Sequence, residues 1–291
     1  MMRQYLRIVL SLCLIGLTPL YVFAEDSLCP DLPPPAPSPS PSPTPAPTAT
    51  PTPKPSPVPE QPPKDKITDY NLHDLIPSVY FKPIINLDVK NCDSEQMTCM
   101  YTPAGKALQR MCEKDFKRCL MEGSCFVMKV NAVKSYNYHT RVDGRSRFEE
   151  NHSEKCPYGY GVRRSCLDPY FTVAADRRYY KPGDVIFVPK LVGLKLPGGV
   201  SHDGFLIVRD IGEKIKGPRR FDFFTGIHTH LSKNNPIANE GFADYGNRFK
   251  FRRATEKETE IVIRLRNYPS LNEATFNEAK DLGKNLVDQG S

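Results

Sequence analysis

The chain has 291 residues, a net charge of +7, 29 prolines and nine cysteines. Acidic and basic residues are mixed along it without a basic run, which argues against a nucleic-acid-binding protein. The mild positive charge fits contact with an anionic polymer, and it fits a solvated mixed surface equally well. Residues 1–24 and 25–66 cannot join a hydrophobic core, so the folded part is shorter than the 291 residues suggest.

Residues 1–24 have the layout of a signal peptide. Arg3 and Arg7 precede an apolar run over residues 8–23, and Ala24 offers a small residue for cleavage. The run is shorter than the roughly 20 residues that a membrane-spanning helix needs. We therefore expect export to the periplasm or secretion, with no transmembrane segment after cleavage; an uncleaved anchor is the alternative.

Residues 25–66 are predicted to form a disordered, proline-rich linker. Between positions 30 and 63, 17 of the 34 residues are proline, mostly alternating with Ser, Thr and Ala. This composition excludes helices and sheet ladders, because proline lacks the backbone donor that both require. As polyproline II the segment can extend on the order of 100 Å as a spacer. A docking site for a proline-reading partner is the alternative.

Eight cysteines remain after the signal peptide, an even number that indicates disulfides in an exported protein. They lie at positions 29, 92, 99, 112, 119, 125, 156 and 166. No Cys-x-x-Cys pair is present, so no metal site is expected, and no cofactor is expected either. The pairing stays open, since eight cysteines allow 105 connectivities.

Residues 67–125 contain five of these cysteines and are predicted to be a helical, disulfide-rich extension. The apolar positions that fall on one helical face are Leu108, Met111, Cys112, Phe116, Cys119 and Leu120. Cys112 and Cys119 are two turns apart on this face. Each is therefore expected to bond a different segment rather than the other.

Residues 126–270 are predicted to be a β domain, because short β-branched and aromatic runs alternate with turn signals such as KPGD and LPGG. The expected strands cover residues 126–130, 171–175, 185–188, 205–208, 220–224 and 261–265. Six such runs indicate a small barrel or sandwich. Residues 271–291 are expected to form a surface helix, capped by Ser270 with Glu273 three positions on.

Three aspartates stand where strand residues are expected. Asp176 follows the run 171–175, Asp210 ends the run 205–209, and Asp222 lies within the run 220–224. Aspartate is disfavoured in strands, so each of these residues caps a turn, pairs with a base or has a functional role.

Asp222 is expected on the open face of its strand. Strand alternation places it with Phe224 and Arg220, while Phe221 and Phe223 point into the core. An aromatic neighbour and a second carboxylate would both raise its pKa, by desolvation and by repulsion. Pairing of Asp222 with Arg220 or the adjacent arginine is the alternative from chemistry alone.

The motifs around these aspartates resemble the Asp-Asp-Asp (3D) domain, which is shared with membrane-bound lytic transglycosylase A and forms a six-stranded double-psi β-barrel. The matching stretches are TVAAD at 172–176, PGDVIFVP at 182–189, LPGG at 196–199, HDG at 202–204, VRDIGEKIKG at 208–217 and FDFFTG at 221–226. All three aspartates occur in order with their local motifs, over roughly residues 126–255.

The resemblance implies a lytic transglycosylase that cleaves the MurNAc–GlcNAc bond of peptidoglycan and leaves a 1,6-anhydro end. It implies that Asp222 is the single catalytic acid and base, supported by Asp210 and Asp176. The expected partners are peptidoglycan glycan strands, and a monomer is expected. Expected substrate contacts are Lys216, Gly217, Gly212, Phe224 and Tyr138, although a turn that needs positive φ also explains the glycines.

In the full-length transglycosylase a larger β domain forms the opposite wall of the groove. No such domain is evident in this sequence, and residues 67–125 are the candidate for replacing it. Two other functions remain open: a non-catalytic module that binds cell-wall polysaccharide, and a hydrolytic glycosidase in which Asp210 and Asp222 form a pair.

Overall fold

The computed structural model describes residues 29–33, 70–89, 92–130, 132–280 and 282. The expected signal peptide and nearly all of the expected linker lie outside these residues. The described part is mainly β, with three α-helices. Its strands are β1 (His73–Tyr80), β2 (Ile84–Asn86), β3 (Met97–Tyr101), β4 (Ala107–Cys112), β5 (Ser124–Lys129), β6 (Ala132–Val142), β7 (Arg145–Glu150), β8 (Thr172–Ala175), β9 (Val185–Phe187), β10 (Phe205–Ile211), β11 (Arg220–Phe224) and β12 (Phe249–Arg253). The helices are α1 (Glu113–Met121), α2 (Glu256–Leu265) and α3 (Glu273–Lys280).

Six strands close into a barrel in the order β1-β11-β8-β10-β9-β12, which confirms the predicted six-stranded barrel. Two pairs are parallel, β1 with β11 and β8 with β10. Inward-facing side chains such as Val173, Leu206, Phe221 and Phe251 fill the interior and are fully buried. The alternation expected for β11 holds, because Phe221 and Phe223 are both in this core.

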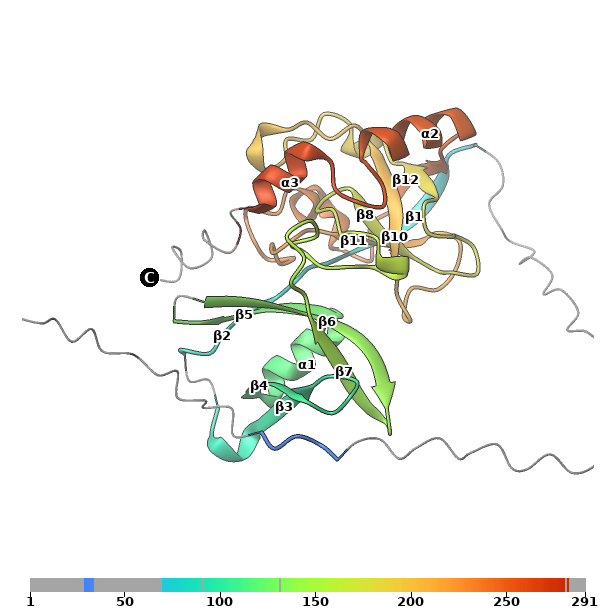
Figure 1. Cartoon of the computed structure of the whole chain (residues 1–291). Coiled ribbons are helices and arrows are strands. Elements are labelled where there is room, and N and C mark those ends of the chain that lie inside the picture. The colour runs from blue at the N-terminus through green and yellow to red at the C-terminus, as the bar shows by residue number, and fades with distance from the viewer. Residues whose placement is uncertain (1–28, 34–69, 90–91, 131, 281, 283–291) are drawn as a thin grey trace, which may run out of the picture.

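A second β unit is inserted into the barrel sequence: the chain leaves the barrel after β1 and returns at β8 (Figure 1). This inserted β domain, residues 84–150, contains a four-stranded sheet in the order β2-β5-β6-β7, the β3–β4 hairpin and α1. Its own core includes Met100, Met111, Tyr136 and Phe148. The protein therefore does contain a second β unit, which sequence patterns did not reveal.

Strand pairing differs from the expected division into a helical extension over 67–125 and a barrel from 126 onward. β1 belongs to the barrel although it precedes the cysteine-rich segment, and β5 pairs with β2 and β6 outside the barrel. A run such as 126–130 identifies a strand but not its sheet, because pairing partners lie far apart in sequence.

Two expected elements have a different secondary structure. Residues 261–265, expected as a strand, lie in α2, which begins with a capping box between Thr255 and Glu258. The expected helical face over 108–120 is split, because β4 runs to Cys112 and α1 begins at Glu113.

The C-terminal helix is confirmed over α3, but its cap differs from the one expected. The N-cap residue of α3 is Asn272 and not Ser270. Asn272 Oδ1 accepts the Thr275 N–H at 2.8 Å. The remainder of the expected helix lies outside the described residues, apart from Leu282.

All eight expected cysteines form disulfides: Cys29–Cys99, Cys92–Cys112, Cys119–Cys125 and Cys156–Cys166. As predicted, Cys112 and Cys119 bond different segments. Cys29 ties the start of the described chain to β3, and Asp31 Oδ1 accepts the N–H of Ala107, the first residue of β4, at 2.7 Å. Four disulfides fit an exported protein. Within the described ranges, no helix has the length and apolar character needed to cross a membrane.

Candidate active site

Asp222 and Asp210 lie in one row across the barrel wall. Ser78 on β1 is opposite Asp222 on β11, and Ala174 on β8 is opposite both Asp222 and Asp210. Residues directly opposite in a sheet point to the same face. The two aspartates therefore flank the small side chain of Ala174, about two strand spacings or ~10 Å apart at their backbones. A register shift in β10 between Val208 and Asp210 sets Asp210 into this row.

Asp222 is held by a short relay from β1. Arg220 Nη2 donates to Ser78 Oγ at 2.7 Å, and Ser78 Oγ donates to Asp222 Oδ1 at 2.5 Å. Arg220 therefore contacts Asp222 through Ser78. Burial raises the pKa of Asp222, against the Ser78 hydrogen bond and the Arg220 charge, which lower it. Asp222 as a residue is partly exposed, although its carboxyl group lies in surroundings that are buried enough to raise its pKa.

Asp210 is the second carboxyl group in the row. The Ile211 N–H donates to its Oδ1 at 2.8 Å, and the Tyr80 hydroxyl donates to its Oδ2 at 3.2 Å. Burial, against these two hydrogen bonds and with a smaller contribution from the charge of Asp222, raises the pKa of Asp210 to about 6. Repulsion between the two carboxylates, which the sequence predicts, therefore contributes to the raised pKa of Asp210.

Asp176 is a different kind of carboxylate from the other two. Its side chain is only 3% exposed, pairs with Arg178 at 2.6 Å and accepts the Gly217 N–H at 2.9 Å. Although burial opposes ionisation, the donors from Arg178 and Gly217 hold the pKa of Asp176 at about 2. Asp176 therefore anchors the loop that follows β10 and remains ionised at neutral pH.

Replacing Asp176 with asparagine is expected to lower the free energy of unfolding by about 1–2 kcal/mol at pH 7, since much of the pairing with Arg178 is screened by solvent. The folded pKa of about 2 is below the roughly 3.9 of an unfolded aspartate. The stabilisation is thus complete above pH ~4 and lost as the pH falls towards ~2. Urea titrations of both proteins at pH 7 and pH 2.5 check this. An equal gap at both pH values would contradict it.

The expected substrate contacts after β10 lie on this anchored loop. Lys216 is exposed, and Gly217 has a φ of 95°, the left-handed region that favours glycine. A Cβ at Gly212 would lie 2.5 Å from Ile215 Cγ1, so close packing explains this glycine. Lys216 is the member of this group whose side chain is available to a ligand.

Phe224 does not have the accessible face expected of it. It is 1% exposed and packs against Tyr80 and Tyr158, with ring centroids 5.1 and 5.9 Å away. It therefore supports β11 rather than offering a stacking surface. Tyr138, on β6 of the inserted β domain, is 41% exposed and keeps a face available.

Of the nearby tyrosines in the chain, Tyr136 is fully buried, and Tyr158 and Tyr160 are partly buried. His202 shapes a turn. Its Nδ1 accepts the Gly204 N–H at 2.8 Å, while its Nε2 contacts the Tyr170 carbonyl at 3.0 Å. Burial lowers the pKa of His202 to about 4.

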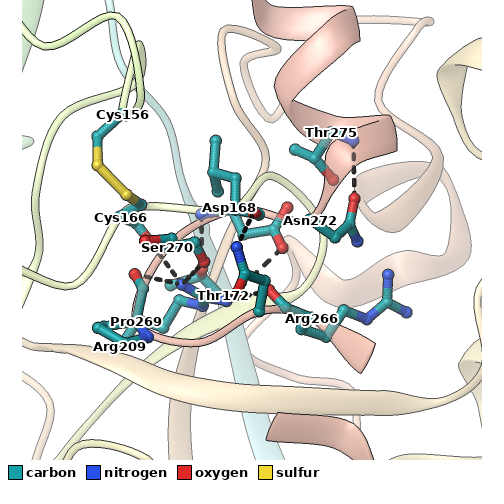
Figure 2. Close-up of polar contacts among 12 residues, drawn as sticks. Cys156, Cys166, Asp168, Thr172, Arg209, Arg266, Pro269, Ser270, Asn272 and Thr275 are labelled. Atoms are coloured by element: carbon teal, nitrogen blue, oxygen red, sulfur yellow. Dashed lines mark hydrogen bonds and ion pairs between the residues drawn. A yellow bond between two sulfur atoms is a disulfide. The ribbon is translucent and has the colours of Figure 1, made fainter. Parts of the chain in front are cut away.

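A buried ion pair supports the strand that carries Asp210. Arg209 and Asp168 are both fully buried, with Nη2 and Oδ2 3.9 Å apart. Figure 2 shows the Arg209 guanidinium among backbone oxygens, and its Nη1 donates to the carbonyls of Cys166, Pro269 and Ser270 at 2.9–3.0 Å. Burial raises the pKa of Asp168, against the charge of Arg209. Arg209 thus fastens β10 to the segment between α2 and α3.

Sequence reasoning missed three residues of the site, namely Ser78, Tyr80 and Glu122. Ser78 and Tyr80 come from β1, whose sequence HDLIPSVY carries no recognisable motif. Glu122 follows α1 in the inserted β domain, and its Oε2 accepts the Phe81 N–H at 3.3 Å. Only the three-dimensional fold brings Ser78 to Asp222, Tyr80 to Asp210 and Glu122 to the end of β1.

Several solved structures resemble the chain at low sequence identity. E. coli MltA with bound chitohexaose is 16% identical, with a TM-score of 0.41 over 62% of this chain and 72% of that one. A membrane-bound lytic murein transglycosylase from Agrobacterium tumefaciens is 14% identical, with a TM-score of 0.41 over 64% and 74%. The lytic transglycosylase LtgG of Burkholderia pseudomallei is 14% identical, with a TM-score of 0.34 over 62% and 71%.

A search of curated protein sequences found no match. The model of the family described as the 3D domain matches residues 171–235, a range that contains all three aspartates of the sequence analysis. Residues 171–235 of this chain are therefore similar to the 3D domain.

Proposed function

We propose that the protein is a peptidoglycan lytic transglycosylase with Asp222 as its single general acid and base. The observation that carries the proposal is the state of Asp222 within the 3D domain. It is partly exposed, has a raised pKa and is fixed at one oxygen by Ser78. A carboxyl group with a raised pKa can hold a proton and then donate it near the working pH.

The proposed reaction has two proton transfers. Protonated Asp222 first gives its proton to the oxygen between MurNAc and GlcNAc, and the bond from that oxygen to C1 of MurNAc breaks. The C6 hydroxyl of MurNAc then attacks C1, and the Asp222 carboxylate removes its proton as the 1,6-anhydro ring closes. Ser78 occupies Oδ1, which leaves Oδ2 for the transferred proton. Asp222 ends the cycle protonated, and no water is consumed.

The other sequence-predicted residues take supporting roles in this proposal. Asp210 lies across Ala174 from Asp222 and contributes to the electrostatics of the row, and Asp176 holds the Gly217 loop in place. Lys216 and Tyr138 are exposed and are assigned to glycan contacts. Gly212 and Gly217 shape the loop, and Phe224 packs against Tyr80 and Tyr158 on the same side of β11 as Asp222.

Hydrolysis is the second candidate, and the raised pKa of Asp210, about 6, is what favours it. A hydrolytic glycosidase uses one carboxyl group as acid and a second to activate water or attack the sugar. Asp210 and Asp222 would form that pair. A wall-binding module that does not cut is the remaining alternative.

The barrel type and the cellular compartment belong to the same proposal. We assign the barrel to the double-psi type, which its two parallel strand pairs support. We place the protein in the periplasm or outside the cell, because its four disulfides require an oxidising compartment.

Digestion of purified sacculi tests the function. The full chain with its disulfides formed is expected to release soluble muropeptides whose mass spectra show 1,6-anhydro ends. Muropeptides with only reducing ends would favour hydrolysis by Asp210 and Asp222. Binding of sacculi without any soluble product would favour the non-catalytic module.

A further inference from the structure

A pocket of about 120 Å³ lies between α3 and the barrel, beyond the end of β11. Thr275 and Glu278 of α3 line it, together with Gly226 and His228 from the loop that follows β11. We call it the α3 pocket. Since a cavity of roughly 150 Å³ is filled by one benzene molecule, this pocket has room for one small group and not for a glycan strand.

Two tyrosines supply aromatic rings to the α3 pocket. Tyr170 is buried and Tyr158 is partly buried, and both line it. The Tyr158 ring packs edge-on against Phe224, with centroids 5.9 Å apart. The Tyr170 N–H donates to the Phe224 carbonyl at 2.7 Å. Both tyrosines are therefore fixed on the end of β11, the strand that carries Asp222.

One carboxylate of the α3 pocket lacks a cationic partner. Glu278 lines the pocket and is exposed, so it stands where the pocket meets solvent. Within the described residues it forms no hydrogen bond or ion pair. Burial, with a smaller contribution from the charge of Asp168, raises the pKa of Glu278. This is the effect expected of a carboxylate without a nearby cation.

The two basic side chains that line the α3 pocket do not balance this charge. Arg266 pairs with Asp203 at 2.8 Å and lies over the Phe171 ring, 3.3 Å from its centre. Burial lowers the pKa of His228, so its imidazole is neutral at neutral pH. The α3 pocket thus combines an unbalanced negative charge with aromatic rings, and both attract an ammonium group.

We propose that the α3 pocket binds a primary ammonium group on a short alkyl chain, with the Glu278 carboxylate as its counter-ion and the rings of Tyr158 and Tyr170 beside the chain. Thr225 also lines the pocket and lies three residues beyond Asp222, or roughly 10 Å along an extended chain. The source of the ammonium group rests on the proposed function: the glycan strand bound at Asp222 carries peptide stems with free amino groups. Glu278 is then a specificity-determining residue, which favours strands with free amines over strands whose amines are blocked.

Binding of pentylamine tests the pocket without activity, with uncharged 1-pentanol as the matched ligand. In ¹H–¹⁵N NMR spectra of the full chain with its disulfides formed, pentylamine is expected to shift the amide signals of Gly226 and His228 saturably. Glu278→Gln is expected to weaken this binding about fivefold. Glu273→Gln, exposed in the first turn of α3, should bind like the wild type. No saturable shift, equal affinity in Glu278→Gln, or equal binding of 1-pentanol would overturn the proposal.

Sacculi whose amino groups have been acetylated test the source of the ammonium group. At limiting sacculus concentration the wild type and Glu273→Gln are expected to digest acetylated sacculi about fivefold more slowly than untreated sacculi. Glu278→Gln is expected to digest both at the same rate. Equal wild-type rates on the two substrates would overturn the assignment to peptide stems. If the wild type releases nothing from either, the proposed function fails, while the pentylamine titration still decides whether the α3 pocket binds an ammonium group.

Discussion

Asp222→Asn is expected to lower the rate of muropeptide release from sacculi by about 100-fold to 10,000-fold relative to the wild type. Asparagine has nearly the same shape and can still accept the Ser78 hydroxyl hydrogen bond at Oδ1, so the fold is expected to persist. What it cannot do is carry a proton to the leaving oxygen or remove one from the C6 hydroxyl. Both proposed steps therefore fail together.

The matched control is Asp244→Asn. Asp244 is exposed, and its Oδ1 accepts the Gly246 N–H at 2.7 Å. It is expected to digest sacculi at the wild-type rate. Muropeptide release is followed by chromatography, and circular dichroism verifies the fold of each variant. Wild-type release by folded Asp222→Asn would exclude Asp222 as the catalyst.

Arg209→Met is expected to cause the largest loss of stability, about 3–5 kcal/mol in the free energy of unfolding. The substitution removes the cation that faces Asp168 and the donor shared by three backbone carbonyls. Buried carbonyl oxygens that lose their donor have neither a protein nor a water partner, so the free energy of unfolding falls by their full desolvation penalty. Methionine fills most of the volume, so the loss reflects polarity more than packing.

Urea denaturation with the disulfides intact measures this loss. Arg264→Met is the control, because Arg264 is exposed in the last turn of α2, and a change within about 0.5 kcal/mol is expected there. A loss below about 1 kcal/mol for Arg209→Met would show that the buried pair is not a principal support of β10.

The barrel strands that were predictable are those with strong local patterns. β8, β9, β10 and β11 follow their apolar runs closely, and the alternation in β11 correctly separated Asp222 from Phe221 and Phe223. These features depend on neighbouring residues in the chain. The disulfides were predictable as a class for a similar reason, because an even cysteine count is a property of the sequence alone.

The parts that sequence did not predict depend on pairing over long distances. β1 joins β11 across more than a hundred residues, and nothing in its sequence indicates that partner. The second β unit was missed because its strands were assigned to the barrel or to a helical extension. Glu122 could not be connected with the end of β1 for the same reason, since it reaches Phe81 only after the inserted β domain folds.

Chemistry also limited the site prediction. The three aspartates were identified by their unusual strand positions, but strand position does not reveal that their pKa values shift in different directions. Arg178 and Gly217 keep Asp176 ionised, whereas burial raises the pKa of Asp210 and Asp222. Phe224 followed the expected alternation yet became covered by Tyr80 and Tyr158, which come from distant parts of the chain. A local motif does not predict which distant segments will cover a side chain.

The central claim is that Asp222 uses the C6 hydroxyl of the sugar and not water to complete cleavage. Digestion of sacculi in water enriched in ¹⁸O tests it directly, with mass spectrometry of the released muropeptides. The 1,6-anhydro products are expected to carry no ¹⁸O, because the ring closes within the sugar. Products with reducing ends that have gained one ¹⁸O at C1 during cleavage would contradict the claim and identify the enzyme as a hydrolase.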